Sequence, residues 1–105
     1  MSTYIAQKRS EDVNGRTTIE VAFGPDKADN DKIVPDAIRA IEALELQGGR
    51  LICIDGAASL PAAMAIAHAV CHLYSYVACY DPKLHRFVVA IAHGPEHKPG
   101  ELLPF

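Results

Sequence analysis

The sequence predicts an α/β fold, in the form of one Rossmann-like domain with a mixed, mostly parallel sheet and two main helices. Segments with strand character alternate with segments of helical spacing, so that two βαβ units follow each other along the chain. At 105 residues the chain is long enough for one hydrophobic core but not for two, so residues 1–105 are expected to form a single domain. A ferredoxin-like arrangement is the alternative.

The first part of the chain is predicted to contain a strand, a helix and a second strand. Residues 17–23 (TTIEVAF) alternate and are β-branched, which is typical of a strand, and residues 4–5 are expected to begin a short edge strand. Pro35 stands at a plausible first helical position, and the glycines at 48–49 end the helix. Residues 51–54 (LICI) form a continuous apolar run, as expected for a central strand covered on both faces.

The second part adds another helix and a hairpin. Ser59 is expected to cap a helix that runs to about residue 73. Residues 74–80 and 87–92 are predicted strands joined by a turn, and the tail beyond them is predicted to be loop up to residues 102–103. The two βαβ units give parallel strands with right-handed crossovers, and the hairpin adds an antiparallel strand.

Composition and charge limit the function classes. Half of the residues are hydrophobic and 22% are charged, which is an ordinary globular balance. The formal net charge of −3 argues against broad binding to nucleic-acid backbones, DNA included, whereas a short nucleotide in a local pocket is compatible with it. Residues 1–12 lack the apolar core of a secretory leader, and the low-charge run 56–80 is expected to form a buried helix and a strand rather than a membrane span. Three cysteines without paired spacing favour a reduced, cytoplasmic setting, in which they pack as core residues.

The loop Gly56–Ser59 follows the predicted central strand and is a candidate ligand site. Ligands on such sheets collect at the C-terminal ends of the strands, near helix N-termini. The small side chains of this loop would let backbone N–H groups approach a phosphate, although a plain helix-capping turn explains them equally well. A bulky residue at Gly56 is expected to weaken ligand binding and to leave the fold intact.

Four of the five histidines lie within residues 67–94. His68 and His72 stand four residues apart in an apolar run, so they share one face of the predicted helix. A single histidine on such a helix is more often a core or boundary residue, but two at this spacing can present imidazoles to one site. The helix lacks the glutamate of a zincin, so it is not a known zinc signature.

The predicted hairpin carries further chemistry-bearing residues. Asp81 ends its first strand, Lys83 follows in an Asp-Pro-Lys turn, and His93 ends its second strand. An Asp-Pro pair also commonly makes a plain turn. If the fold brings the histidine face of the helix to the same end of the sheet, then imidazoles, a carboxylate and an ammonium gather there. That set suits metal-assisted or acid–base work on a phosphodiester.

The segments VACYDPKL (77–84), VVAIAHG (88–94) and IAHAVCH (66–72) resemble the small ring nucleases of type III CRISPR systems. The resemblance covers roughly residues 51–103, and the N-terminal half matches in its strand–helix order. It implies a Rossmann-like domain related to CRISPR-associated nucleotide-sensing domains, in a stand-alone form without the ATPase domain of some larger relatives. It also implies a homodimer that stacks into tetramers or filaments with its ligand.

The implied activity is cleavage of the second messenger cyclic tetra-adenylate to linear oligoadenylates, which switches off type III CRISPR signalling in antiviral defence. The resemblance implies Mn²⁺ as the cofactor, held by Asp81 and His93. The implied catalytic residues are His72, Asp81, Lys83 and His93, and the expected ligand contacts are Gly56, Ser59 and His68. Lys83 stands where arginine is expected, and lysine cannot make the forked phosphate contact of a guanidinium.

Alternatives to this enzyme follow from the same residues. A non-catalytic module that binds cyclic oligoadenylate needs the ligand contacts but not the catalytic ones. A manganese-dependent 3′ exoribonuclease on linear RNA needs the catalytic ones, but the acidic net charge disfavours long RNA. Within the ring nuclease hypothesis, either the 2′-OH of the messenger or a metal-activated water attacks the phosphorus.

Overall fold

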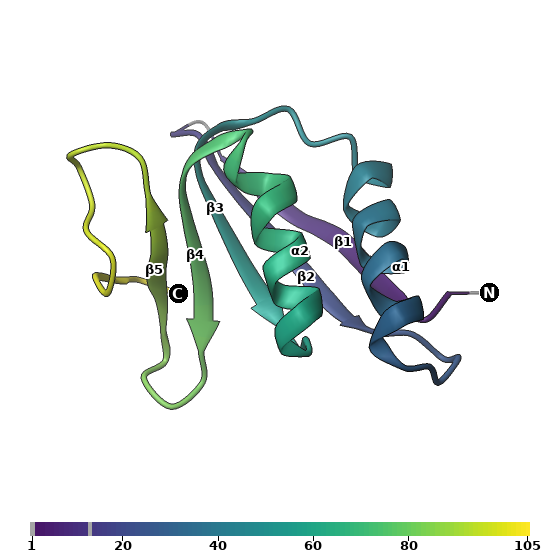
Figure 1. The fold of residues 1–105 in the computed structure, drawn as a ribbon. Coiled ribbons are helices and arrows are strands. Elements are labelled where there is room, and N and C mark those ends of the chain that lie inside the picture. Colours follow the sequence, from purple (N-terminus) through teal and green to yellow (C-terminus); the bar gives the residue numbers. More distant parts are fainter. Residues whose placement is uncertain (1, 13) are drawn as a thin grey trace.

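A computed structural model of the protein describes residues 2–12 and 14–105. In this part of the chain the elements are, in order, β1 (Tyr4–Glu11), β2 (Arg16–Phe23), α1 (Asn30–Ala43), β3 (Gly49–Gly56), α2 (Leu60–Cys71), β4 (Tyr74–Asp81), β5 (Arg86–Ala92) and β6 (Leu102–Leu103) (Figure 1). The strands form one sheet in the spatial order β1-β2-β3-β4-β5-β6. The predicted order from β2 to β5, including both helices, is confirmed.

The prediction of a mostly parallel sheet is wrong. β2–β3 and β3–β4 are parallel, but β1–β2, β4–β5 and β5–β6 are antiparallel, so antiparallel pairings are the majority in the described sheet. The edge strand predicted to begin at residues 4–5 is present and runs to Glu11, and residues 102–103, where the predicted loop ends, form β6. Both are edge strands, and most of β1 is exposed, so neither shows the apolar pattern by which an inner strand is recognised.

Helix α1 begins before the position that the sequence indicates. Pro35 lies inside the helix, five residues after its start at Asn30, and not at its first position. The helical turn before Pro35 is stabilised by packing, because Ile33 belongs to the apolar face of the helix and is buried with Ala37 and Ile41. The predicted cap of α2 is confirmed, since Ser59 is its N-cap residue.

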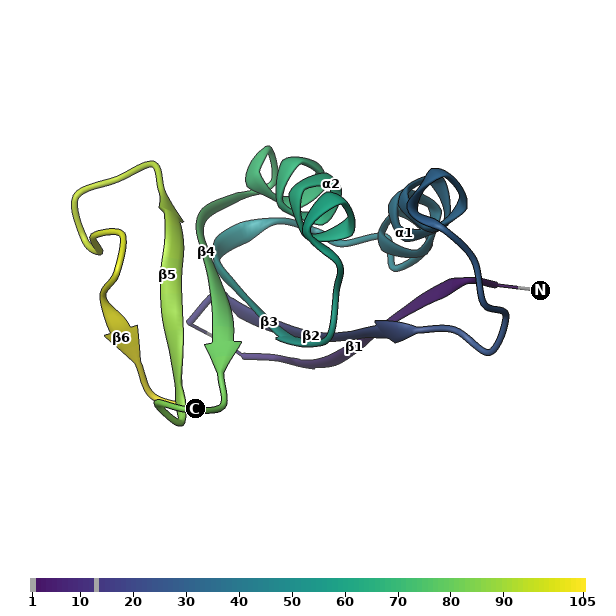
Figure 2. The ribbon, with the colours of Figure 1, turned by 60° about the horizontal axis from the view of Figure 1, so that its bottom comes forward.

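Both helices pack on the same face of the sheet (Figure 2). Ile52 and Ile54 of β3 face them and join the larger core cluster. Leu51 and Cys53 point to the opposite face and form a second cluster, to which β4, β5 and Leu103 of β6 contribute. The run 51–54 is therefore buried on both faces as predicted, although only one of the faces is covered by helices.

The cysteines differ in environment. Cys53 is buried, and burial raises the pKa of its thiol to about 11. Cys71 is half-buried and packs against the larger core cluster, whereas Cys79 is exposed, so the prediction that all three pack in the core is wrong for Cys79. Across residues 2–12 and 14–105, no helix combines the length and the apolar character needed to cross a membrane.

Candidate functional site

Asp81 organises the turn between β4 and β5. Its carboxylate Oδ1 accepts the backbone N–H of Lys83 at 2.9 Å and that of Leu84 at 3.3 Å, an arrangement typical of an Asx turn. Among the described residues, none donates to its second oxygen. The side chain of Asp81 is half-exposed, and it lies in the same turn as the exposed side chain of Lys83.

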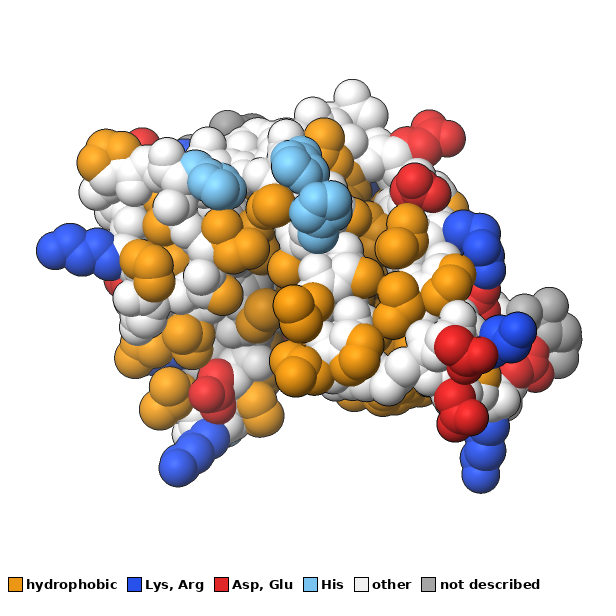
Figure 3. All heavy atoms as spheres, in the orientation of Figure 1, with side chains coloured by type: hydrophobic (Ala, Val, Ile, Leu, Met, Phe, Trp, Pro, Cys, Tyr) orange, Lys and Arg blue, Asp and Glu red, His pale blue; other side chains and the backbone are white. Residues whose placement is uncertain are grey.

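Three histidines lie at the other end of the sheet. His68 is in the last turn of α2 and His72 is its C-cap residue, and their Nε2 atoms are 3.2 Å apart. The backbone N–H of His93, just after β5, donates to the carbonyl of Ser75 at the start of β4. Because β4 begins directly after α2, His93 lies at the same end as the helical pair. Figure 3 shows histidine side chains gathered at one end of the face that carries the helices.

The structure therefore divides the predicted site into two ends. The histidine end contains His68, His72 and His93, and the aspartate end contains Asp81, Lys83 and the loop Gly56–Ser59. In the β4–β5 ladder, Asp81 lies opposite Arg86, whereas the backbone of His93 bonds to that of Ser75. Ser75 precedes Asp81 by six residues along β4. At about 3.3 Å per residue, Asp81 and His93 are roughly 20 Å apart in one chain.

The expectation that these groups gather at one end of a single chain is therefore wrong. The second strand of an antiparallel hairpin returns to the start of the first, so residues that end consecutive strands lie at opposite ends. One Mn²⁺ cannot bind both Asp81 and His93 of one chain. Within the described residues there is also no group of three or more His, Cys, Asp or Glu side chains that could hold a metal ion.

Gly56 is required by the fold itself. Its φ is +124°, and a Cβ built on it would lie 1.8 Å from the carbonyl oxygen of Val21 in β2. The expectation that a bulky residue here would leave the fold intact is therefore wrong. The loop is held further by Ala57, whose N–H donates to Val21 and whose carbonyl accepts the Tyr4 hydroxyl at 2.5 Å. Tyr4 is fully buried, and this burial raises its pKa to about 12.

Ser59 uses its hydroxyl within the chain. The hydroxyl accepts the N–H of Ala62 at 3.3 Å and donates to the side-chain oxygen of Asn30, at the start of α1, at 2.7 Å. Pro61 has no N–H to offer a ligand. Few donors at this helix N-terminus are thus left for a phosphate, and the structural role of Ser59 as a cap is the one its contacts explain. Ligand contact by this loop stays a prediction.

An apolar cavity of about 250 Å³ lies between α2 and strands β2 to β5. It reaches the aspartate end, because its walls include Gly56 and Ala58 of the loop and Tyr80 beside Asp81. Its remaining walls are aliphatic or small: Val21, Ile54, Ala63, Ile66, Ala67, Val77, Cys79, Ala90 and Ile91. The sequence did not indicate this cavity, because each wall residue alone resembles ordinary core.

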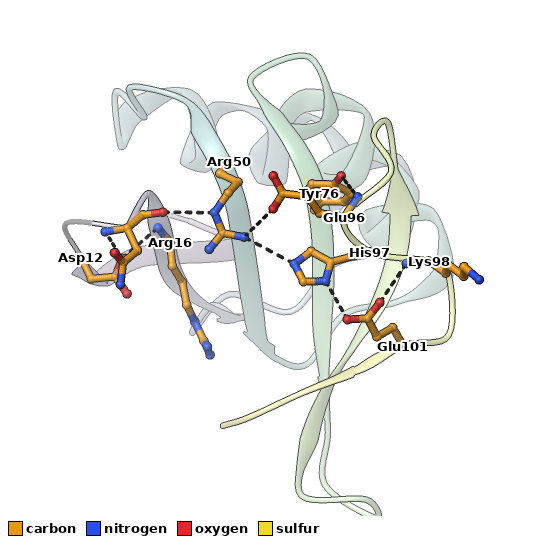
Figure 4. Close-up of polar contacts among 9 residues, drawn as sticks. Asp12, Arg16, Arg50, Tyr76, Glu96, His97, Lys98 and Glu101 are labelled. Carbon is orange, nitrogen blue, oxygen red and sulfur yellow. Dashed lines mark hydrogen bonds and ion pairs between the residues drawn. The ribbon is translucent and has the colours of Figure 1, made fainter.

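The sequence patterns also did not indicate a polar cluster that joins His97 and Glu101 of the C-terminal segment to Arg50 (Figure 4). His97 Nδ1 lies 2.7 Å from the carboxylate of Glu101, and its Nε2 lies 3.4 Å from Arg50 of β3. A guanidinium only donates, so Nε2 is the acceptor and Nδ1 carries the proton. The hydrogen bond from His97 lowers the pKa of Glu101. The backbone N–H of Glu96 donates to the Tyr76 hydroxyl, so the cluster fastens the segment after β5 to β3 and β4.

Fold and site together define a small α/β domain, with a mixed sheet, an Asp-Pro-Lys turn at one end and histidines at the other. Residues 26–104, about three quarters of the chain, match the family model described as CRISPR-associated protein (Cas_csx3). The chain belongs to this CRISPR-associated family. The resemblance seen in the sequence is thereby confirmed at the level of CRISPR association. No curated protein matches the sequence.

Proposed function

We propose that the protein is a ring nuclease that cleaves cyclic tetra-adenylate to linear oligoadenylates and so switches off type III CRISPR signalling. Family membership supports the setting. The observation that carries the proposal is the division of the site, with the Asp81 turn at one end of the sheet and the histidines at the other. A ring held between two copies of the protein would contact both ends at once.

The proposed assembly is a head-to-tail stack of homodimers. In it, the histidine end of one dimer faces the aspartate end of the next, and the messenger lies between them. Such a contact joins two different surfaces, so it continues into a filament unless its rotation closes a ring. His72 and His93 of one dimer then share a site with Asp81 and Lys83 of its neighbour.

In the proposed reaction, the 2′-oxygen of one ribose attacks the adjacent phosphorus, and the bond from phosphorus to the 5′-oxygen breaks. The products are a 2′,3′-cyclic phosphate and a free 5′-OH. His72 transfers a proton, either from the 2′-OH or to the leaving 5′-oxygen. The Lys83 ammonium stabilises the charge that develops on the phosphoryl oxygens, and the free oxygen of Asp81 orients the reacting ribose.

The Mn²⁺ implied by the resemblance does not fit a single chain, because Asp81 and His93 are too far apart to share an ion. No step is therefore assigned to it. If manganese is the cofactor, its ligands come from two stacked dimers, and a requirement for Mn²⁺ should then appear together with ligand-driven assembly.

The apolar cavity supplies a place for one adenine. The ring faces of a purine pack against apolar walls, and aliphatic and small residues with one tyrosine provide such walls. Gly56 and Tyr80 are among its walls, so a base bound there would lie near the Asp81 turn. With the adenine in the cavity, the phosphodiester to be cleaved would lie close to Asp81 and Lys83 at the aspartate end.

The decisive assay incubates the purified protein with labelled cyclic tetra-adenylate, with and without Mn²⁺. We expect linear products, and a 2′,3′-cyclic phosphate end distinguishes attack by the 2′-OH from attack by water. Binding without cleavage would favour the non-catalytic module. Cleavage of linear poly-A but not of the ring would favour the 3′ exoribonuclease.

A mixing experiment tests the divided site. His72→Ala and Asp81→Ala should each abolish or strongly reduce cleavage. Mixing the two inactive variants should restore part of it, because an intact histidine end then meets an intact aspartate end. His85→Asn, in the same turn as Asp81, is the matched control and should cleave at the parental rate. If the mixture stays inactive although both variants bind the messenger, the site is not shared between dimers.

A further inference from the structure

His68 and His72 form a pair whose geometry suits a bound metal ion. Their Nε2 atoms lie 3.2 Å apart, and the rings are perpendicular with centroids separated by 4.7 Å. A tetrahedral ion that holds two imidazole nitrogens at about 2.0–2.1 Å separates them by roughly 3.3–3.4 Å. The observed separation is close to this value, so an ion could bind both nitrogens with only a small side-chain adjustment.

The surroundings of the pair favour a metal ion that prefers nitrogen over oxygen ligands. Helix α2 contains no aspartate or glutamate, so it offers no carboxylate oxygen to a hard ion. The pair lies in the last turn and at the C-cap, where the backbone carbonyls without helical partners carry partial negative charge. Both histidines are exposed, so the remaining coordination positions of an ion are open to water.

We propose that His68 and His72 form a two-histidine chelate for a transition-metal ion of the Zn²⁺, Ni²⁺ or Cu²⁺ type. Imidazole suits these ions, whereas Mn²⁺ and Mg²⁺ prefer oxygen ligands and stand low in the affinity order for nitrogen sites. The chelate uses other side chains than the manganese site that the resemblance implies, whose ligands are Asp81 and His93. It requires neither messenger nor assembly, so it does not depend on the proposed nuclease activity.

Calorimetric titration of the untagged protein with ZnCl₂, NiCl₂ and MnCl₂ tests the chelate. We expect one Zn²⁺ or Ni²⁺ per chain, and Mn²⁺ bound at least about tenfold more weakly. His68→Ala and His72→Ala should each weaken Zn²⁺ binding on the order of a hundredfold, because the second ligand of a chelate binds as an intramolecular group. His85→Asn removes an exposed histidine outside the pair and should change nothing.

A second readout is thermal stability. An ion that binds only the folded protein raises the melting temperature, and Zn²⁺ should do so for the parent and for His85→Asn but not for the pair variants. His68→Gln serves as a further variant, since glutamine is a good helix former and keeps the exposed position polar. Zn²⁺ affinity in His68→Ala and His68→Gln equal to that of the parent would overturn the proposal, as would Mn²⁺ binding at the parental site as tightly as Zn²⁺.

Discussion

Replacing Gly56 with alanine should destabilise the protein far more than the same change at Gly100. Both glycines have positive φ, +124° and +91°, so alanine is strained at either position. At Gly56 the new Cβ would lie 1.8 Å from the Val21 carbonyl oxygen, whereas at Gly100 no described atom lies within 4 Å. The pair of variants therefore separates backbone strain from steric conflict.

The magnitudes follow from these two causes. A residue held in a sparsely populated backbone region costs about 1–3 kcal/mol, which applies to both variants. Overpacking adds typically about 1–3 kcal/mol, and only at Gly56. The expected loss is thus roughly 2–6 kcal/mol at Gly56, towards the upper end because the conflicting atom is backbone, which moves only if the β2–β3 pairing shifts.

Urea denaturation followed by circular dichroism measures both losses. A domain of this size has a total free energy of unfolding of about 5–15 kcal/mol, so the loss expected for Gly56→Ala is a large part of that total. If that variant is too unstable for a full curve, its yield and melting temperature relative to Gly100→Ala still rank the two. Equal stability of the two variants would refute the steric reasoning and would restore Gly56 as a position open to ligand-directed substitution.

Three further outcomes follow from the contacts of the aspartate end and the N-terminus. Tyr4→Phe removes the hydroxyl that donates to the Ala57 carbonyl and should lower the free energy of unfolding by about 0.5–1.5 kcal/mol in urea denaturation, which is the net contribution of one hydrogen bond. The pKa of Asp36 is lowered from 3.8 to about 2, chiefly by hydrogen bonds from Thr3, so its contribution is present above pH 3.8 and is lost as the pH falls towards 2. Stability measured against pH should therefore fall less steeply in this window for Asp36→Asn than for the parent. Ala67→Leu narrows the apolar cavity and should weaken binding of cyclic tetra-adenylate in an Asp81→Ala background, measured by calorimetry, whereas an unchanged affinity would place the base elsewhere.

Local sequence signals are sufficient to predict the inner strands and the helix start that Ser59 caps. Residues 17–23 and 51–54 are apolar or alternating because their strands are covered, and Ser59 marks the start of α2 because its hydroxyl caps the helix. The edge strand β1 is mostly exposed, so the partner strand β2, and not its own pattern, makes it a strand. Strand β6 has two residues and depends in the same way on β5.

The candidate site shows a different limit. Residue type and spacing select the candidate residues, but the expectation that they gather at one end of the sheet is wrong, although the sequence contains the signal for their separation. Once 74–80 and 87–92 are predicted as a hairpin, antiparallel pairing alone puts Asp81 and His93 at opposite ends. The cavity and the contacts of His97 could not be found in this way, because their members come from several elements whose packing no local pattern specifies.

The separation of the two ends has a kinetic consequence under the proposed function. If Asp81 of one dimer and His72 of its neighbour act on the same phosphodiester, the active species contains at least two dimers, and its amount depends on protein concentration. The rate per chain at fixed messenger should rise with protein concentration until assembly is complete, and then level off. Light scattering in the presence of the uncleaved messenger and the Asp81→Ala variant should show larger particles over the same concentration range. A rate per chain that stays constant from the lowest protein concentrations would mean that one dimer contains a complete site, and the opposite ends of the hairpin would then have to meet across the dimer interface instead.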